Sequence, residues 1–154
     1  MLVARGTIEH RQAILKIGFQ PFVPEAYEVS PIQIPLEVPI AEYRALIDTG
    51  AQRTCLTRKT IADESLMPHA KKPIQNVHNA NMHYLYWAHL GFWAEASSFP
   101  DEPPTDRTYF ALPTPTEVID IASNNWFDAI VGMDILQHYD LRFDKTGHFE
   151  LRLA

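Results

Sequence analysis

Residues 46 to 51 read Leu-Ile-Asp-Thr-Gly-Ala, and this short segment says more about the chain's architecture than any other. The apolar residues before Asp48 predict a buried strand over 43–48 that ends at a carboxylate. The small residues after it allow a tight turn, and Gly50 lets its amide approach the carboxylate without a Cβ in the way. Asp, Thr and Gly also occur in ordinary turns, so a surface-turn aspartate is the alternative for this segment alone.

A second segment strengthens the first. About eighty residues later, Ala129-Ile130-Val131-Gly132 leads into Met133-Asp134-Ile135-Leu136, an apolar strand that enters a short helix. In this order and spacing, the two segments resemble the catalytic loop and the hydrophobic-hydrophobic-Gly segment of the retropepsin-like aspartic proteases. The resemblance covers roughly residues 40 to 145. It implies a mostly β, closed barrel-type acid protease fold with one or two short helices.

The resemblance also implies a hydrolase, an aspartic endopeptidase that uses no cofactor. Two carboxyl groups held close together share one proton, so one can activate water while the other donates to the peptide carbonyl. Asp48 is then catalytic, with Thr49 and Gly50 supporting its loop. The 154 residues have room for one domain, a hairpin and proline-rich stretch over 1–40 followed by a core over 41–154. One Asp-Thr-Gly per chain therefore implies a homodimer.

By the same resemblance, a peptide or protein substrate would contact residues beside Asp48 and lie beneath a flap, a hairpin that covers the substrate. The substrate-binding positions are Ala51, Gln52, Arg53, Ile130 and Val131, and the flap positions are Val77, His78, Asn79, Ala80 and Asn81. Retroviral relatives differ at two places. They carry acidic residues where this chain has Gln52 and Arg53, one of them paired with an Arg at the position of Met133, and their flaps are rich in glycine.

Alternation and turn residues predict the remaining elements. In residues 31–40 the apolar side chains occupy alternate positions, which indicates that one face of this proline-rich segment packs while the chain is extended. The stretch Ile74–Trp93 has apolar residues on both faces, which indicates a strand that runs from an exposed hairpin into the core. Its upstream partner strand is expected at 73–77, with a turn near 78–81. The other expected elements are a hairpin over 5–20 with its turn at 9–12, a strand over 52–56, a helix over 58–66 capped by Thr57, a polar loop over 97–106, strands over 109–112 and 117–121, a helix over 133–139, and a hairpin over 141–153.

Composition narrows the partners and the compartment. The formal charge of −6, with no basic cluster longer than Lys71-Lys72, argues against a nucleic-acid partner. No apolar run approaches 18 residues and no signal-peptide pattern begins the chain, so no membrane association is expected. The single cysteine, Cys55, fits a reducing compartment, and a cytoplasmic location is expected.

Other residues that can bind metals or ligands have simpler explanations. His83 and His89 share a strand face but lie six residues apart, near 20 Å, too far for one metal ion. They and His78 are expected to face solvent or to be hydrogen-bonded. Cys55 is expected to be a small core residue. Trp87, Trp93 and Trp126 are expected in the core or an interface.

Two questions remain open at this point. Asp134 either complements the helix dipole or accepts a hydrogen bond from Thr54. The whole chain is either a protease or a non-catalytic dimeric module that holds peptides in the same fold, and it could also act inside a larger assembly. The intact Asp-Thr-Gly favours catalysis, since a binding module has no need for two repelling carboxyl groups.

Overall fold

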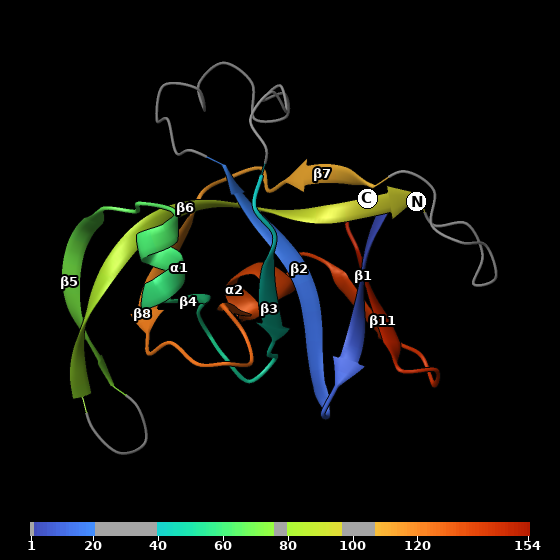
Figure 1. Ribbon diagram of the computed structural model, residues 1–154, viewed down its shortest axis with the longest axis horizontal. Helices are drawn as coiled ribbons and strands as arrows, with labels where there is room; N and C mark the ends of the chain where they lie inside the picture. The colour runs from blue at the N-terminus through green and yellow to red at the C-terminus, as the bar shows by residue number, and fades with distance from the viewer. Residues whose placement is uncertain (1, 21–39, 76–79, 97–106) are drawn as a thin grey trace.

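The structure is a computed structural model that describes residues 2–20, 40–75, 80–96 and 107–154 (Figure 1). Three predictions lie outside these residues: the packing of 31–39, the polar loop over 97–106, and the flap positions Val77, His78 and Asn79. Within the described residues, no helix is long and apolar enough to cross a membrane.

The prediction of a mostly β fold is confirmed. In the described part of the chain, eleven strands form one mixed sheet and two short helices pack beside it. The strands are β1 (Leu2–Glu9), β2 (Gln12–Gln20), β3 (Tyr43–Ile47), β4 (Cys55–Thr57), β5 (Pro68–Gln75), β6 (Ala80–Ala96), β7 (Thr108–Ala111), β8 (Thr116–Ile121), β9 (Ala129–Val131), β10 (Asp140–Phe143) and β11 (His148–Arg152), and the helices are α1 (Arg58–Asp63) and α2 (Met133–Leu136).

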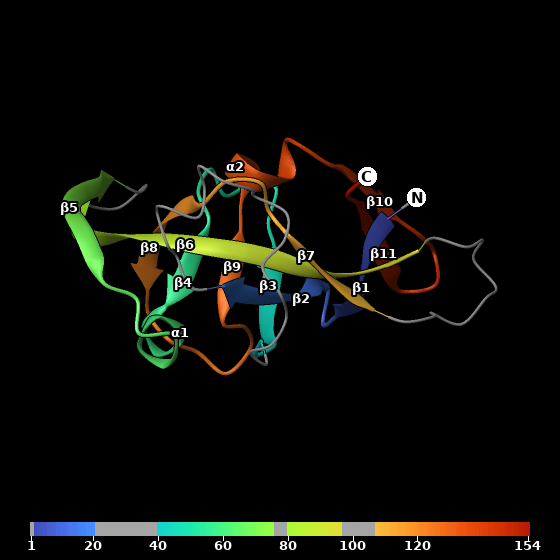
Figure 2. The ribbon, with the colours of Figure 1, turned by 90° about the horizontal axis from the view of Figure 1, so that it is seen from above.

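The sheet closes on itself. Neighbouring strands follow the order β2-β3-β9-β4-β8-β6, and β6 returns to pair with β2 through residues 89–92 and 17–20. Closure is possible because β6 is long enough to pair with β8 through one part of its length and with β2 through another. Figure 2 shows β6 running nearly the whole length of the molecule. The expected barrel-type closure is therefore present.

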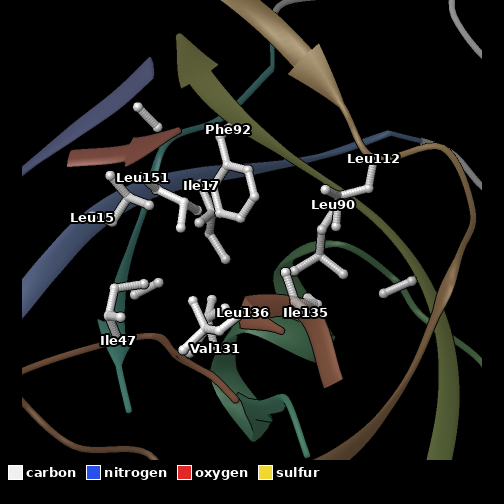
Figure 3. Close-up of a cluster of buried hydrophobic side chains, with 14 of the residues drawn as sticks. Leu15, Ile17, Ile47, Leu90, Phe92, Leu112, Val131, Ile135, Leu136 and Leu151 are labelled. Atoms are coloured by element: carbon white, nitrogen blue, oxygen red, sulfur yellow. The ribbon is translucent and has the colours of Figure 1, made fainter. Parts of the chain in front are cut away.

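The core fills the inside of this barrel. Alternation on the strands turns one face inward, and α2 closes part of the same space with Ile135 and Leu136 (Figure 3). The fully buried members come from strands far apart in the sequence and include Leu15, Ile17, Leu90, Phe92, Val131 and Leu151. Burial of these side chains stabilises the barrel and fixes which residues of each strand face outward.

Local signals set several element boundaries. His10 and Arg11 have φ of 51° and 66°, so the β1–β2 hairpin closes with a two-residue turn at the predicted place. Thr57 caps α1 as expected, because its hydroxyl accepts from the Thr60 amide at 3.3 Å. The helix predicted to reach residue 66 ends at Asp63, since Ser65 takes φ 53° and turns the chain so that Leu66 packs on the core. The predicted 133–139 helix also ends early, at Leu136.

Candidate active site

Asp48 occupies the place where the chain leaves β3. β9 lies between β3 and β4 in the sheet, so the loop over 48–54 must cross the end of β9 to reach β4. The Asp48 amide donates to the Val131 carbonyl at 3.1 Å, and the Gly50 amide donates to Asp48 Oδ1 at 2.8 Å. The carboxylate is half-buried, and Thr49 and Gly50 are exposed. In the described part of the chain, Asp48 Oδ2 has no protein donor, so this oxygen is open to a ligand or a second chain.

The loop is held from behind by the start of α2, through a set of contacts that we call the brace. The Met133 amide donates to the Ala51 carbonyl at 2.8 Å, and the Asp134 amide donates to the Gln52 carbonyl at 3.2 Å. The brace therefore fixes the loop by its backbone, and the side chains of Gln52 and Met133 are not needed for it.

The Asp134 carboxylate completes the brace. It accepts from the Thr54 amide at 3.0 Å and from the Thr54 hydroxyl at 2.8 Å, and that hydroxyl accepts in turn from the Gly132 amide at 3.2 Å. Thr54 is fully buried. Of the two roles predicted for Asp134, acceptance from Thr54 is confirmed. The strand predicted from residue 52 is wrong at its start, because 52–54 bond to α2 and the ladder begins only at Cys55.

Gly132 is required by the close approach of the two segments. A Cβ at this position would lie 2.7 Å from the Arg53 carbonyl oxygen and 2.8 Å from that of Ala51. Both neighbours are backbone atoms, which cannot move aside as a flexible side chain could. The small residue at the end of the second motif is thus explained by packing against the first.

Outside the barrel core, an apolar row lies on the same sheet face as Asp48. Directly paired residues share a face and alternate residues on a strand return to it, so Asp48 points to the side of Leu46. We call this row the apolar floor; strand register aligns its members as Leu46, Ile130, Cys55, Ile119 and Leu85. Leu46 and Ile130 are half-buried and the other three are buried.

The two substrate contacts predicted on β9, Ile130 and Val131, differ in how accessible their side chains are. Ile130 belongs to the apolar floor and reaches the surface beside Asp48. Val131 is fully buried in the barrel core, so its side chain cannot contact a ligand, and its expected substrate role is corrected. Its contribution is the carbonyl that holds the Asp48 amide.

A charged row borders the apolar floor. Arg53 Nη1 lies 3.3 Å from Glu117 Oε1, and His69 Nε2 lies 3.1 Å from Glu117 Oε2. The His69 ring stacks on Trp87 with centroids 5.1 Å apart and planes 17° apart. Arg53 was predicted here, whereas Glu117, His69 and Trp87 were not. Glu117 lies two residues from Ile119 on β8, and Trp87 lies two residues from Leu85 on β6, so each shares a sheet face with a member of the apolar floor. This alternation in the sequence could have predicted their positions.

A groove of about 800 Å³ is bordered by this charged row and by α2. The residues that line it include Gln52, Arg53, Glu117, His138 and Tyr139. Two of the three expected substrate residues after Gly50 therefore border this groove. Ala51, the third, is half-buried and is tied to both Asp48 and Met133 through its backbone.

His83 and His89 are hydrogen-bonded and Cys55 is buried, as predicted, whereas His78 lies outside the described residues. His83 Nδ1 lies 3.1 Å from Asp120 Oδ1, and His89 Nε2 lies 2.8 Å from the Leu112 carbonyl. Burial lowers the pKa of His89, against the opposing effect of that carbonyl. Burial, with the Asp134 and Asp48 charges, raises the pKa of Cys55 to about 11. Among the described residues, no three His, Cys, Asp or Glu side chains are placed to hold a metal ion.

The β5–β6 hairpin stands where the flap was predicted. β5 pairs with the first part of β6, and the last described pair is Gln75 with Ala80. Ile74 belongs to β5, within the segment predicted as the upstream partner strand. Ala80 and Asn81 begin β6, as a hairpin near 78–81 requires. The outer part of the hairpin is exposed, with Met82 at 54%. Trp87, where β6 pairs with β8, is 39% exposed, so it is not the core residue that was one expectation.

This arrangement is similar to that of a solved protein structure. A crystal structure of a retropepsin-like aspartic protease from Rickettsia conorii superposes with a TM-score of 0.55 over 98% of this chain and 91% of that chain, at 11% sequence identity. The likeness shows that the chain has a retropepsin-like fold. No protein-family model matches the sequence, and no curated protein matches it either.

Proposed function

We propose that this chain is an aspartic endopeptidase in which Asp48 pairs with Asp48 of a second copy. One observation carries the proposal: at the end of a buried strand the Asp48 amide is held by the Val131 carbonyl and one carboxylate oxygen by the Gly50 amide, while the second oxygen has no donor in the described part of the chain. The retropepsin-like fold supports the same reading. A surface-turn aspartate needs no buried brace behind it.

The chemistry follows from pairing two such carboxyl groups. Close apposition disfavours double ionisation, so the pair retains one proton. The ionised Asp48 takes a proton from water, which attacks the peptide carbonyl carbon, and the protonated Asp48 donates to the carbonyl oxygen. Return of protons to the leaving amine and the dyad completes hydrolysis. The apolar floor beside Asp48 would hold substrate side chains and exclude water.

The dimer is part of this proposal because one chain supplies one Asp48. Thr49 and Gly50 are exposed next to it, which leaves room for the same loop of a second copy. A two-fold axis through this point would bring the two carboxyl groups together with identical surroundings.

A peptide library incubated between pH 4 and 7 tests the proposal, with wild type beside Asp48→Asn. Cleavage by wild type should fall by about a thousandfold or more in the variant, the scale of acid–base catalysis, while its melting temperature stays unchanged. Asp140→Asn is the matched control, since this exposed aspartate lies on β10. Activity per chain should also fall on dilution, as the dimer dissociates.

Two results would contradict the proposal. Undiminished cleavage by Asp48→Asn would remove Asp48 from the reaction, and full activity of a monomer at nanomolar concentration would remove the shared dyad. A dimer that binds peptides and cleaves none at any pH would instead fit the non-catalytic binding module.

A further inference from the structure

We propose that Arg53 selects an acidic side chain in the substrate, about three residues from the bond that is cut. This inference rests on the proposed function, because it concerns the peptide held beside Asp48. It assigns a substrate class to the charged row that borders the apolar floor.

The distance follows from the sheet. Asp48 ends β3, and Arg53 lies two residues before β4, with β9 between these strands. Two strand spacings amount to about 10 Å, and an extended peptide advances about 3.3 Å per residue. A substrate that crosses these strands from Asp48 therefore brings a side chain about three residues away to Arg53.

The hydrogen-bonding capacity of Arg53 indicates which kind of substrate group it can bind. A guanidinium has five N–H donors, and the recorded side-chain contact of Arg53 in the described part of the chain is the one from Nη1 to Glu117. The Arg53 side chain is 37% exposed, so donors remain available to a ligand.

The nearby acidic groups are already engaged. Glu117 has one oxygen against Arg53 and the other against His69. Both oxygens of Asp134 accept from Thr54. The imidazole of His138 also lines the groove. Of the described arginine and carboxylate side chains that line the groove, Arg53 is thus the one with unused hydrogen-bonding capacity. A planar guanidinium suits a carboxylate, which can accept two parallel hydrogen bonds.

Glu117 and His69 act as positioning residues. The stack of His69 on Trp87 holds the imidazole against Glu117, and Glu117 holds the guanidinium at the groove. The contact leaves Arg53 Nε and Nη2 for the substrate. Aspartate and glutamate side chains both fit the available volume of about 800 Å³.

Two variants that break the same ion pair test the proposal. Peptides that differ only in Glu or Gln at the third residue from the cut are compared by kcat/KM in wild type, Arg53→Gln and Glu117→Gln. Wild type should prefer Glu by about tenfold, the scale of a hydrogen bond to a charged group. Arg53→Gln should abolish the preference, and Glu117→Gln should retain or strengthen it, because the competing carboxylate is gone.

A merely structural ion pair would make the two variants behave alike, which would overturn the inference. Equal losses for Glu and Gln peptides in Arg53→Gln would do the same, since Arg53 would then bind the peptide backbone. Binding of both peptides to Asp48→Asn, measured by fluorescence anisotropy, separates the two proposals. If wild type cleaves nothing, the protease assignment fails, whereas a Glu preference in binding that requires Arg53 still supports this inference and its absence contradicts it.

Discussion

The Asp48 loop over 48–54 and the β5–β6 hairpin contribute to the same face of the sheet, yet they are held in opposite ways. The loop is anchored by backbone bonds to α2 and by a buried threonine bonded to Asp134. The outer β5–β6 hairpin projects from the rest of the sheet (Figure 1). It is held by its own ladder and by the contacts of His83 and Tyr84 with Asp120, and it exposes Met82 and Tyr84.

This difference separates two requirements of the proposed chemistry. A carboxylate that must lie within hydrogen-bond distance of its partner needs a backbone position fixed by many hydrogen bonds. A segment that closes over variable peptides needs apolar contact surface and few bonds to the body of the protein. Breaking the brace should therefore affect both stability and activity, whereas changes to the outer hairpin should spare stability.

Removal of the Asp134 carboxylate is expected to have the largest effect. Asp134→Ala leaves the buried Thr54 amide and hydroxyl without an acceptor, so the free energy of unfolding should fall by about 4 kcal/mol and activity should disappear. Urea denaturation and peptide cleavage measure the two effects. Asp134→Asn, which keeps one acceptor oxygen and the shape, should lose less of both; equal losses would contradict the role given to the carboxylate.

Two tyrosines on β6 locate the boundary between the body and the hairpin. Tyr86 is 9% exposed and Tyr84, on the same strand face, is 45% exposed. Tyr86→Ala should lower the free energy of unfolding by about 3 kcal/mol, since a large core side chain is lost. Tyr84→Ala should change it by about 0.5 kcal/mol and raise KM instead. Comparable destabilisation by both would show that the outer hairpin is part of the core.

A methyl group at Gly132 tests the close approach within the brace. Gly132→Ala puts Cβ against two carbonyl oxygens, so about 2 kcal/mol of stability should be lost along with activity. Gly147→Ala is the control, because Gly147 has φ 86° and open space around it. That change should cost about 1 kcal/mol for the left-handed backbone and leave kcat/KM unaltered.

The smallest expected effect is a dependence of stability on pH through His89, in the buried part of β6. Burial lowers its native pKa, so its contribution is fully present above the unfolded value of about 6.5 and is lost as the pH falls toward the lowered native value. His89→Gln should flatten the loss of unfolding free energy between pH 7.5 and 5. An unchanged slope in this variant would assign the acid sensitivity to other groups.

Much of the fold was predictable because its signals are local. Alternation placed the strands, Thr57 marked the start of α1, and the turn residues marked both terminal hairpins. The two motifs placed Asp48 and Gly132 correctly on either side of one contact. The role of Asp134 was predicted only as one of two alternatives. A short acidic residue after Gly132 can either complement the helix dipole or accept a hydrogen bond.

The parts that failed depend on residues distant in sequence. Residues 52–54 look extended, but bonds to α2 displace them from the ladder. Val131 and Ile130 are equally apolar, and the register with β3 decides which one faces the core. The pairing of Arg53 with Glu117 joins positions 64 apart and follows from the order of strands, which no local pattern contains.

The position of β9 between β3 and β4 has a consequence during synthesis. Thr54 and Asp134 are 80 positions apart, so the loop cannot acquire its acceptor until most of the chain has left the ribosome. Pairings of this range place folding on the order of milliseconds to seconds rather than microseconds. A nascent chain therefore displays the Asp48 segment without its supporting geometry, and the carboxylate becomes aligned only when translation has passed residue 134.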